Sequence, residues 1–191
     1  MRLGAAGGAA LALAMAGCSA AYVEQDQSSV LFMIESINDG APVISDVRGA
    51  GENPDTIVNC LALVKVSVSM KNPNVTATSV QDVRVTRYEV SYHRSDGRGV
   101  QGVDVPYTIS GNMTITVPAG GEVTFPVDLV RHQAKLLPPL SNITGLQLVT
   151  MFADVTLNGA TISGSNVSGQ GATQVTFADY GTGTATCESG S

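Results

Sequence analysis

The amino-acid sequence predicts an all-β protein, an antiparallel sandwich of about seven to nine strands with one short helical turn. Three observations lead to this prediction. The 191-residue chain is rich in Val and Thr, which favour pleated strands, and has 21 Gly and no Trp. Apolar and polar residues alternate with a period of two in several segments, and clusters of Gly, Pro, Asn and Asp separate these segments at short intervals. A small β-barrel is the alternative fold.

The clearest strand is predicted for residues 56–71. Its even-numbered residues are apolar from position 58 onward, whereas polar side chains occupy most positions between them, apart from Leu61 and Leu63. Such alternation is typical of a strand with one buried face. The phase of the pattern places Cys60 on that buried face.

A second long strand is predicted for residues 80–94, and its alternation slips by one residue. The valines before position 86 follow one phase, and the apolar residues from Tyr88 to Tyr92 follow the other. A β-bulge produces such a slip inside a strand. We therefore expect a bulge near Thr86 and Arg87.

The other predicted elements lie on both sides of these two strands. They are a first strand at 28–37, a loop with at most one short edge strand at 38–55, a hairpin turn at 95–99, a return strand to about residue 109, a turn at 110–112, strands at 113–117 and 122–130, a helical fragment at 131–140, a strand at 146–159 with a hairpin turn at 158–160, a mobile or ribbon-like Gly/Ser segment at 162–172, and a last strand at 173–180. Pro126 has no N–H to donate, so its strand is expected at a sheet edge or to be irregular.

The N-terminus has the layout of a secretory signal. Residues 1–16 combine a positive start with a small apolar run that is shorter than the roughly 20 residues of a membrane span. The run ends at Met15-Ala16-Gly17-Cys18, which resembles the lipobox of bacterial lipoproteins, although that family usually has Leu where Met15 stands. The alternatives are a plain signal peptide with an incidental cysteine, or an uncleaved apolar tail.

The lipobox resemblance implies a membrane address. In the family the cysteine, here Cys18, carries a diacylglycerol, the preceding peptide is removed, and the new amino group is often acylated, for example with palmitate. The sorting rule of enteric bacteria favours the outer membrane when Ser, here Ser19, follows the cysteine. The expected organisation is a lipoprotein signal peptide at 1–17, a lipid-anchored tether at 18–27, a β-sandwich domain at 28–180 and a flexible C-terminal tail at 181–191.

Two cysteines remain beyond the lipobox, Cys60 and Cys187. An even number in an oxidising compartment favours a disulfide, and its long loop would stabilise the fold by about 4–5 kcal/mol on a chain-entropy argument. Such a bridge would also hold the polar C-terminal tail. The alternative is two unrelated thiols, with Cys60 acting as a small core residue.

The pattern of strands across residues 28–180 resembles an immunoglobulin-like fold. The chain has no Trp and lacks the usual cysteine spacing of antibody domains. A fibronectin-III-like or other bacterial immunoglobulin-like sandwich is therefore the closer comparison.

The sequence contains no recognisable catalytic or metal motif. It has no G-x-S-x-G, H-x-x-x-H or C-x-x-C pattern, and its two histidines, His93 and His132, lie far apart in the chain. Asp96 and Asp104 offer two oxygens for calcium, but solvated turn acids are the favoured interpretation. We therefore expect no enzyme activity, no cofactor and no metal. A net charge of −6 and a pI near 4.7 argue against nucleic-acid binding.

Arginines and tyrosines cluster around the second predicted strand and the hairpin turn after it, and both residue types are enriched at interfaces. The possible interaction strip consists of Arg84, Arg87, Tyr88, Tyr92, Arg94 and Arg98. The favoured alternative is a polar sheet face with buried tyrosines.

The expected function is that of a lipid-anchored cell-envelope protein that binds the membrane through its lipid and an envelope protein through its domain, or that has a structural role. The alternatives are a small-ligand carrier with a β-barrel cavity and a metal-dependent enzyme accessory.

Overall fold

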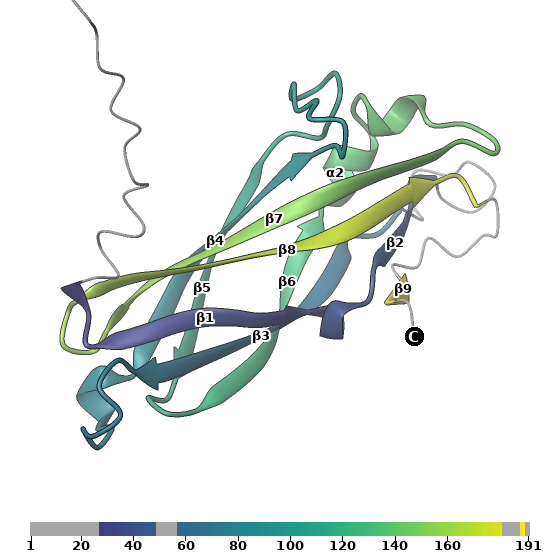
Figure 1. The fold of residues 1–191 in the computed structure, drawn as a ribbon. Helices are drawn as coiled ribbons and strands as arrows, with labels where there is room; N and C mark the ends of the chain where they lie inside the picture. The colour runs from purple at the N-terminus through teal and green to yellow at the C-terminus, as the bar shows by residue number, and fades with distance from the viewer. Residues whose placement is uncertain (1–26, 49–56, 181–187, 190–191) are drawn as a thin grey trace, which may run out of the picture.

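The computed structural model describes residues 27–48, 57–180 and 188–189, which form a mostly-β fold with two sheets (Figure 1). The smaller sheet has the order β1-β3-β6, and the larger sheet has the order β5-β4-β7-β8-β2-β9. The strands are β1 (Val30–Ile37), β2 (Val43–Asp46), β3 (Cys60–Met70), β4 (Val83–His93), β5 (Ile109–Val117), β6 (Glu122–Val130), β7 (Leu148–Thr161), β8 (Asn166–Ala178) and β9 (Glu188–Ser189). One α-helical turn, α2 (His132–Lys135), and three 3-10 helices, η1 (Asn38–Gly40), η4 (Ser79–Gln81) and η5 (Leu140–Asn142), complete the described elements.

The mostly-β, two-sheet prediction is confirmed, but one strand corrects the expectation of a fully antiparallel arrangement. β2 runs parallel to β8 and antiparallel to β9, so it lies between two strands and not at an edge. The chain leaves the smaller sheet after β1 through η1, where Asn38 and Asp39 have positive φ angles of 54° and 52°. This turn delivers β2 to the larger sheet in the direction of β8.

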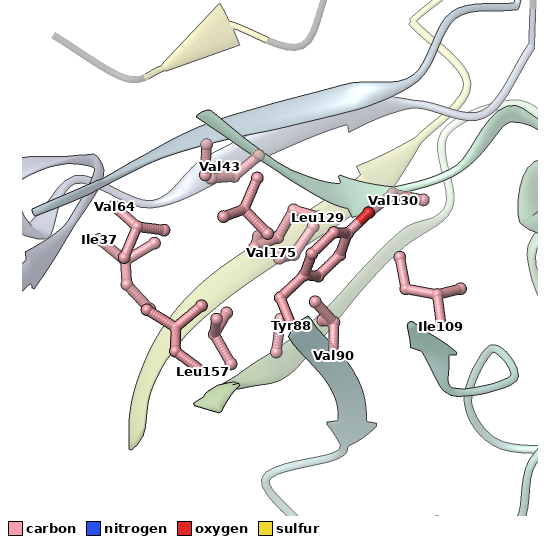
Figure 2. Close-up of a cluster of buried hydrophobic side chains, with 14 of the residues drawn as sticks. Ile37, Val43, Val64, Tyr88, Val90, Ile109, Leu129, Val130, Leu157 and Val175 are labelled. Carbon is pink, nitrogen blue, oxygen red and sulfur yellow. The ribbon is translucent and has the colours of Figure 1, made fainter. Parts of the chain in front are cut away.

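The alternation predicted for the clearest strand is confirmed in β3. The residues from Cys60 to Val68 that share the even phase are buried, and Leu61 and Leu63 are exposed. Their partners across the core come from the larger sheet, where Leu157 on β7 and other apolar side chains meet the smaller sheet (Figure 2). Each fully buried side chain of this size contributes about 1.5–3 kcal/mol to folding. β6 forms the edge of the smaller sheet, as its proline predicted.

The β-bulge predicted in β4 is confirmed, and it explains why β7 continues past the expected turn. The register shifts between Val85 and Arg87 against both neighbouring strands. Gly159 lies opposite, and a Cβ there would stand 2.3 Å from the backbone oxygen of Arg84. The turn predicted at 158–160 is therefore wrong, because the glycine serves a close backbone approach inside the strand.

Gly111 similarly corrects the turn predicted at 110–112. β5 is continuous, and Gly111 pairs with Tyr88, whose ring atoms lie as close as 2.3 Å to the position of a Cβ. The aromatic ring fills the space that a side chain would need. The predicted return strand before position 109 is instead a loop, which contains one isolated bridge between Gln101 and Val105.

The Gly/Ser segment at 162–172 belongs mostly to β8, which matches the ribbon-like alternative. Two of its glycines face the smaller sheet. A Cβ at Gly169 would stand 3.1 Å from the ring of Phe32, and one at Gly171 would stand 3.0 Å from Ile34. The glycines therefore allow β1 to pack closely against β8.

The connections gather at two ends of the molecule. The N-terminal end, where β1 begins, contains loops 71–82, 118–121 and 162–165; the loop end contains loops 94–108 and 131–147 (Figure 1). The 14 residues of β7 run between the two ends and span about 45 Å at a rise of about 3.3 Å per residue.

Several predictions fall on residues outside the described ranges. They concern the signal peptide, Cys18, most of the tether, and Cys187. Part of the tail that was expected to be flexible pairs with the larger sheet, because β9 lies against β2 through the pairs Val43–Ser189 and Ile44–Glu188. Across 27–48, 57–180 and 188–189, no helix has the length and apolar character needed to span a bilayer.

Candidate interaction site at the loop end

A pocket of about 520 Å³ lies at the loop end, between loops 94–108 and 131–147. Its walls are mostly apolar and come from both loops and the start of β5. The apolar lining residues are Pro106, Tyr107, Ile109, Ala134, Leu137 and Pro138. A pocket of this size and lining suits one or two apolar side chains or a small ligand.

Arg131 supplies the charged group of the pocket. It stands between β6 and α2, and its guanidinium donates to the backbone oxygen of Ser110 (2.7 Å) and to the hydroxyl of Tyr88 (3.2 Å). The Tyr88 hydroxyl in turn donates to the carboxylate of Asp128 (3.3 Å). The hydrogen bond with Tyr88 and the nearby negative charge of Asp128 raise the pKa of Arg131 above its ordinary value. The guanidinium is therefore a fixed, oriented donor at the pocket.

Asn59 links the start of β3 to the same region. Its side-chain oxygen accepts from the backbone N–H of His132 (2.8 Å), which fixes the start of α2, and its amide nitrogen donates to Asp128 (3.4 Å). The pocket wall is thus held by hydrogen bonds to the sheet. Apolar walls beside amide and guanidinium donors suit the recognition of an apolar side chain next to a carbonyl or carboxylate.

The six residues of the possible interaction strip do not form one exposed strip. Tyr88 and Tyr92 are buried, whereas Arg84 and Arg87 point to the opposite face of β4. The burial of both tyrosines matches the favoured alternative of a polar sheet face, and it follows from strand alternation with a change of phase at the bulge. Figure 2 shows the Tyr88 ring among buried aliphatic side chains of both sheets.

Tyr92 ties the two sheets together. Its hydroxyl donates to the backbone oxygen of Leu129 on β6, and burial raises the pKa of Tyr92 well above its ordinary value. The hydroxyl is therefore neutral at any physiological pH, which fits a structural role.

Arg94 and Arg98 lie in loop 94–108 with acidic partners. The Arg98 guanidinium stands 2.7 Å from Asp96 and 3.8 Å from Asp104, and Arg94 stands 3.7 Å from Asp96. The hydrogen bond from Arg98 lowers the pKa of Asp96. The two aspartates considered for calcium therefore converge on a guanidinium.

The two histidines occupy separate places. His93, at the end of β4, stacks on Phe152 with a centroid distance of 5.3 Å, and its Nδ1 lies 2.7 Å from Asp154. His132 begins α2. Within the described part of the chain, no three His, Cys, Asp or Glu side chains gather closely enough to hold a metal ion.

Sequence reasoning missed the exposed apolar side chains of the loop end. Val103 is 69% exposed and Leu146 is fully exposed. The larger set consists of Val100, Val103, Tyr107, Leu136, Leu137, Leu146 and Leu148, and we call it the apolar loop set. The signal in the sequence that could have revealed these exposed side chains was the pair Leu146 and Leu148 directly after Gly145. The alternation of apolar residues had placed both leucines in a predicted strand.

A buried lysine was also missed. Lys135, at the end of α2, is only 1% exposed, and burial lowers its pKa to about 8 against the opposing attraction of Asp46. Its Nζ lies 3.9 Å from the sulfur of Cys60. Apolar neighbours at positions 134, 136 and 137 were the only hint that the helical turn packs inward.

Comparisons with known proteins assign no family to this chain. No family model matches it, and no curated protein sequence matches it significantly. Among solved structures, the solution structure of a provisionally assigned late embryogenesis abundant (LEA) protein overlaps 82% of this chain and 76% of its own, with 12% identity and a TM-score of 0.41. This overlap is too loose to suggest a function.

Proposed function

We propose that this chain is a lipid-anchored cell-envelope protein whose immunoglobulin-like β-sandwich binds another polypeptide and catalyses no reaction. The sandwich is supported by the two sheets, whose buried side chains form one shared core. The anchor is supported by the lipobox resemblance at Cys18, and Ser19 favours the outer membrane under the sorting rule of enteric bacteria.

One observation carries the binding role: the pocket and the apolar loop set lie at the end opposite the point where the chain enters the fold. Residue 27 precedes β1 at the N-terminal end. A lipid on Cys18 and a tether of at most about 30 Å would hold that end close to the membrane. The loop end would then stand about 45 Å farther out, facing a partner.

A polypeptide partner accounts for the loop end better than a small ligand does. A small ligand in the pocket leaves Leu146, Val103 and other members of the apolar loop set in water. Exposed apolar side chains at one end of a molecule, beside oriented polar groups, favour a protein interaction site. The small-ligand carrier remains the second candidate, because the pocket volume lies within the range of ligand sites.

Photo-cross-linking in intact envelopes tests this proposal. A photoreactive phenylalanine derivative replaces Leu146 at the loop end or, as the control, Val80 at the N-terminal end, which is also exposed, at 53%. We expect one discrete polypeptide adduct from position 146 and none from position 80. Equal adducts from both positions, or none from position 146, would contradict the binding role.

The anchor is tested separately by metabolic labelling with an alkyne-bearing fatty acid. We expect label on the wild-type chain and none on the Cys18→Ser variant, which should leave the membrane fraction. Label that persists in the variant would refute lipidation at this cysteine.

A further inference from the structure

The free edge of β5 differs from the other long strand edges of the fold. Within the described residues β5 pairs with β4 alone, and its nine residues, ISGNMTITV, include no charge and no proline. By contrast, the edge strand β6 contains Pro126 and two acidic residues, and β1 contains Glu35. Natural sheets use charges, prolines and bulges to prevent pairing at their edges. β5 has neither a charge nor a proline, and its one irregularity is the register shift against β4 between Asn112 and Ile115.

The inward face of β5 is also incompletely covered. Met113 and Ile115 alternate with exposed polar residues and pack against the core, yet both remain partly exposed, as does Val123 on β6. A strand added beside β5 would place its own inward side chains over these groups. The addition would bury apolar surface and would satisfy the outward-facing backbone groups of the edge.

The edge leads directly into the loop-end pocket. Ile109, the first residue of β5, lines the pocket, and Arg131 donates to the backbone oxygen of the next residue, Ser110. An extended chain that follows β5 would therefore reach apolar walls and a guanidinium at its end.

We propose that β5 accepts an extended, uncharged segment of a partner polypeptide as an additional strand, with one apolar side chain of that segment in the pocket. This inference rests on the proposed function and names the conformation in which the partner binds. Backbone hydrogen bonds would supply affinity, and the pocket would supply selectivity.

A second copy of the chain fits this edge poorly. A closed dimer of this chain has a two-fold axis. If that axis ran along the strands, each backbone N–H of β5 would face the same N–H of the second copy, and no hydrogen bond could form. The two β5 strands would therefore have to pair antiparallel. An antiparallel pair puts the two N-terminal ends at opposite ends of the assembly, about 45 Å apart by the span of β7. If both chains were anchored in one membrane by short tethers, only one of them could stand with its N-terminal end at the membrane and its loop end pointing away.

Binding of a defined peptide to the detergent-solubilised mature protein tests the inference. The probe is an acetylated, amidated and fluorescent peptide of about eight residues in which Thr and Val alternate and the last residue is Leu. Met113→Lys puts an inward charge on the edge, and Met33→Lys, on the outward face of β1, is the matched control. We expect Met113→Lys to weaken binding about tenfold or more, the control to stay within about twofold, and a probe ending in Gly to bind about tenfold more weakly.

The location of the bound probe is measured by hydrogen exchange. Added protection of β5 supports strand addition. Equal binding by both lysine variants, or protection at β1 or β6 in place of β5, overturns it. A wild-type dimer in sedimentation that Met113→Lys dissociates also overturns it, because a second copy would then occupy the edge. If adducts at position 146 persist while the probe fails, only this inference is lost; if those adducts fail as well, the proposed function is lost too.

Discussion

The two ends of the molecule are built differently. At the N-terminal end the loops are bonded to one another: the backbone oxygen of Asp82 accepts from Ile162 (2.9 Å), and its carboxylate accepts from Ala119 (2.9 Å). Gly120 donates to Val68 on β3 (2.7 Å). At the loop end the connections are longer and expose the apolar loop set. We call the first end the closed cap because its loops are bonded to one another, although Val75, Val80 and Ile162 are exposed there, whereas the second end is an open surface with a pocket.

This difference separates stability from binding. Loops that bond to each other and to strands contribute to folding, whereas long exposed loops on a rigid sheet are where proteins place binding residues. The loop end also contains the less favourable features of the fold, since a lysine is buried there. We expect substitutions at the two ends to have different consequences.

The largest expected effect concerns the predicted bridge between Cys60 and Cys187. Because β9 pairs with β2, the backbone next to position 187 lies at the larger sheet. We expect Cys187→Ser to lower the free energy of unfolding by about 2–5 kcal/mol, measured by urea denaturation. Two free thiols in the wild-type protein by non-reducing mass spectrometry would contradict the bridge.

The buried lysine gives the next largest effect, and it depends on pH. The pKa of Lys135 is about 8 in the folded protein, against the ordinary lysine value of 10.5 in the unfolded chain. Between about pH 8 and pH 10.5 the unfolded chain therefore binds more protons than the folded protein. The contribution of this group to stability therefore rises with pH in that window. We expect Lys135→Met to raise the free energy of unfolding by about 1–3 kcal/mol at pH 7.

That advantage should shrink as the pH rises from about 8 to 10.5, when the wild-type lysine loses its charge in the fold. Urea denaturation of both proteins at pH 7 and pH 10 measures the difference. A variant that is destabilised at both pH values would indicate that the attraction between Lys135 and Asp46 outweighs the cost of burial.

A smaller effect is expected from the closed cap. Asp82→Ala leaves the N–H of Ala119 without its side-chain acceptor and should lower the free energy of unfolding by about 1–2 kcal/mol. The matched change at the loop end, Asp96→Ala, removes ion pairs with Arg94 and Arg98 and an exposed hydrogen bond from the backbone N–H of Arg98 (3.2 Å), and it should change stability by less than about 0.5 kcal/mol. Equal losses in thermal or urea unfolding would remove the distinction between the two ends.

The smallest effect on stability is expected at Leu146, where we expect the largest effect on partner binding. Leu146→Ser replaces a fully exposed side chain and should shift the free energy of unfolding by less than about 0.5 kcal/mol. We expect Leu146→Ser to lower the yield of partner adducts when the photoreactive residue is placed at the neighbouring exposed position, Leu148. Undiminished adducts would exclude Leu146 from the interface.

Local patterns predicted the fold well where one residue's neighbours in sequence decide its environment. The alternation in β3 placed Cys60 inward, and the phase slip in β4 located the bulge between Val85 and Arg87. Two glycines led to wrong turn predictions, because their role in this fold depends on residues that are distant in sequence. Gly111 and Gly159 indicate turns by composition, yet each lies inside a strand because Tyr88 or the bulged backbone of β4 occupies the space beside it.

By itself, the sequence determined the mostly-β class, the buried faces of the strands, the edge position of the strand with Pro126 and the resemblance of the N-terminus to a lipobox. Only the tertiary structure decided that β2 joins β8 in parallel, that Tyr88 and Arg87 face opposite sides, and that the pocket and the apolar loop set share one end. The physical reason is that alternation and turn chemistry act over a few residues. Sheet order and loop clustering depend on pairings between residues far apart in the chain, such as Val83 and Thr161.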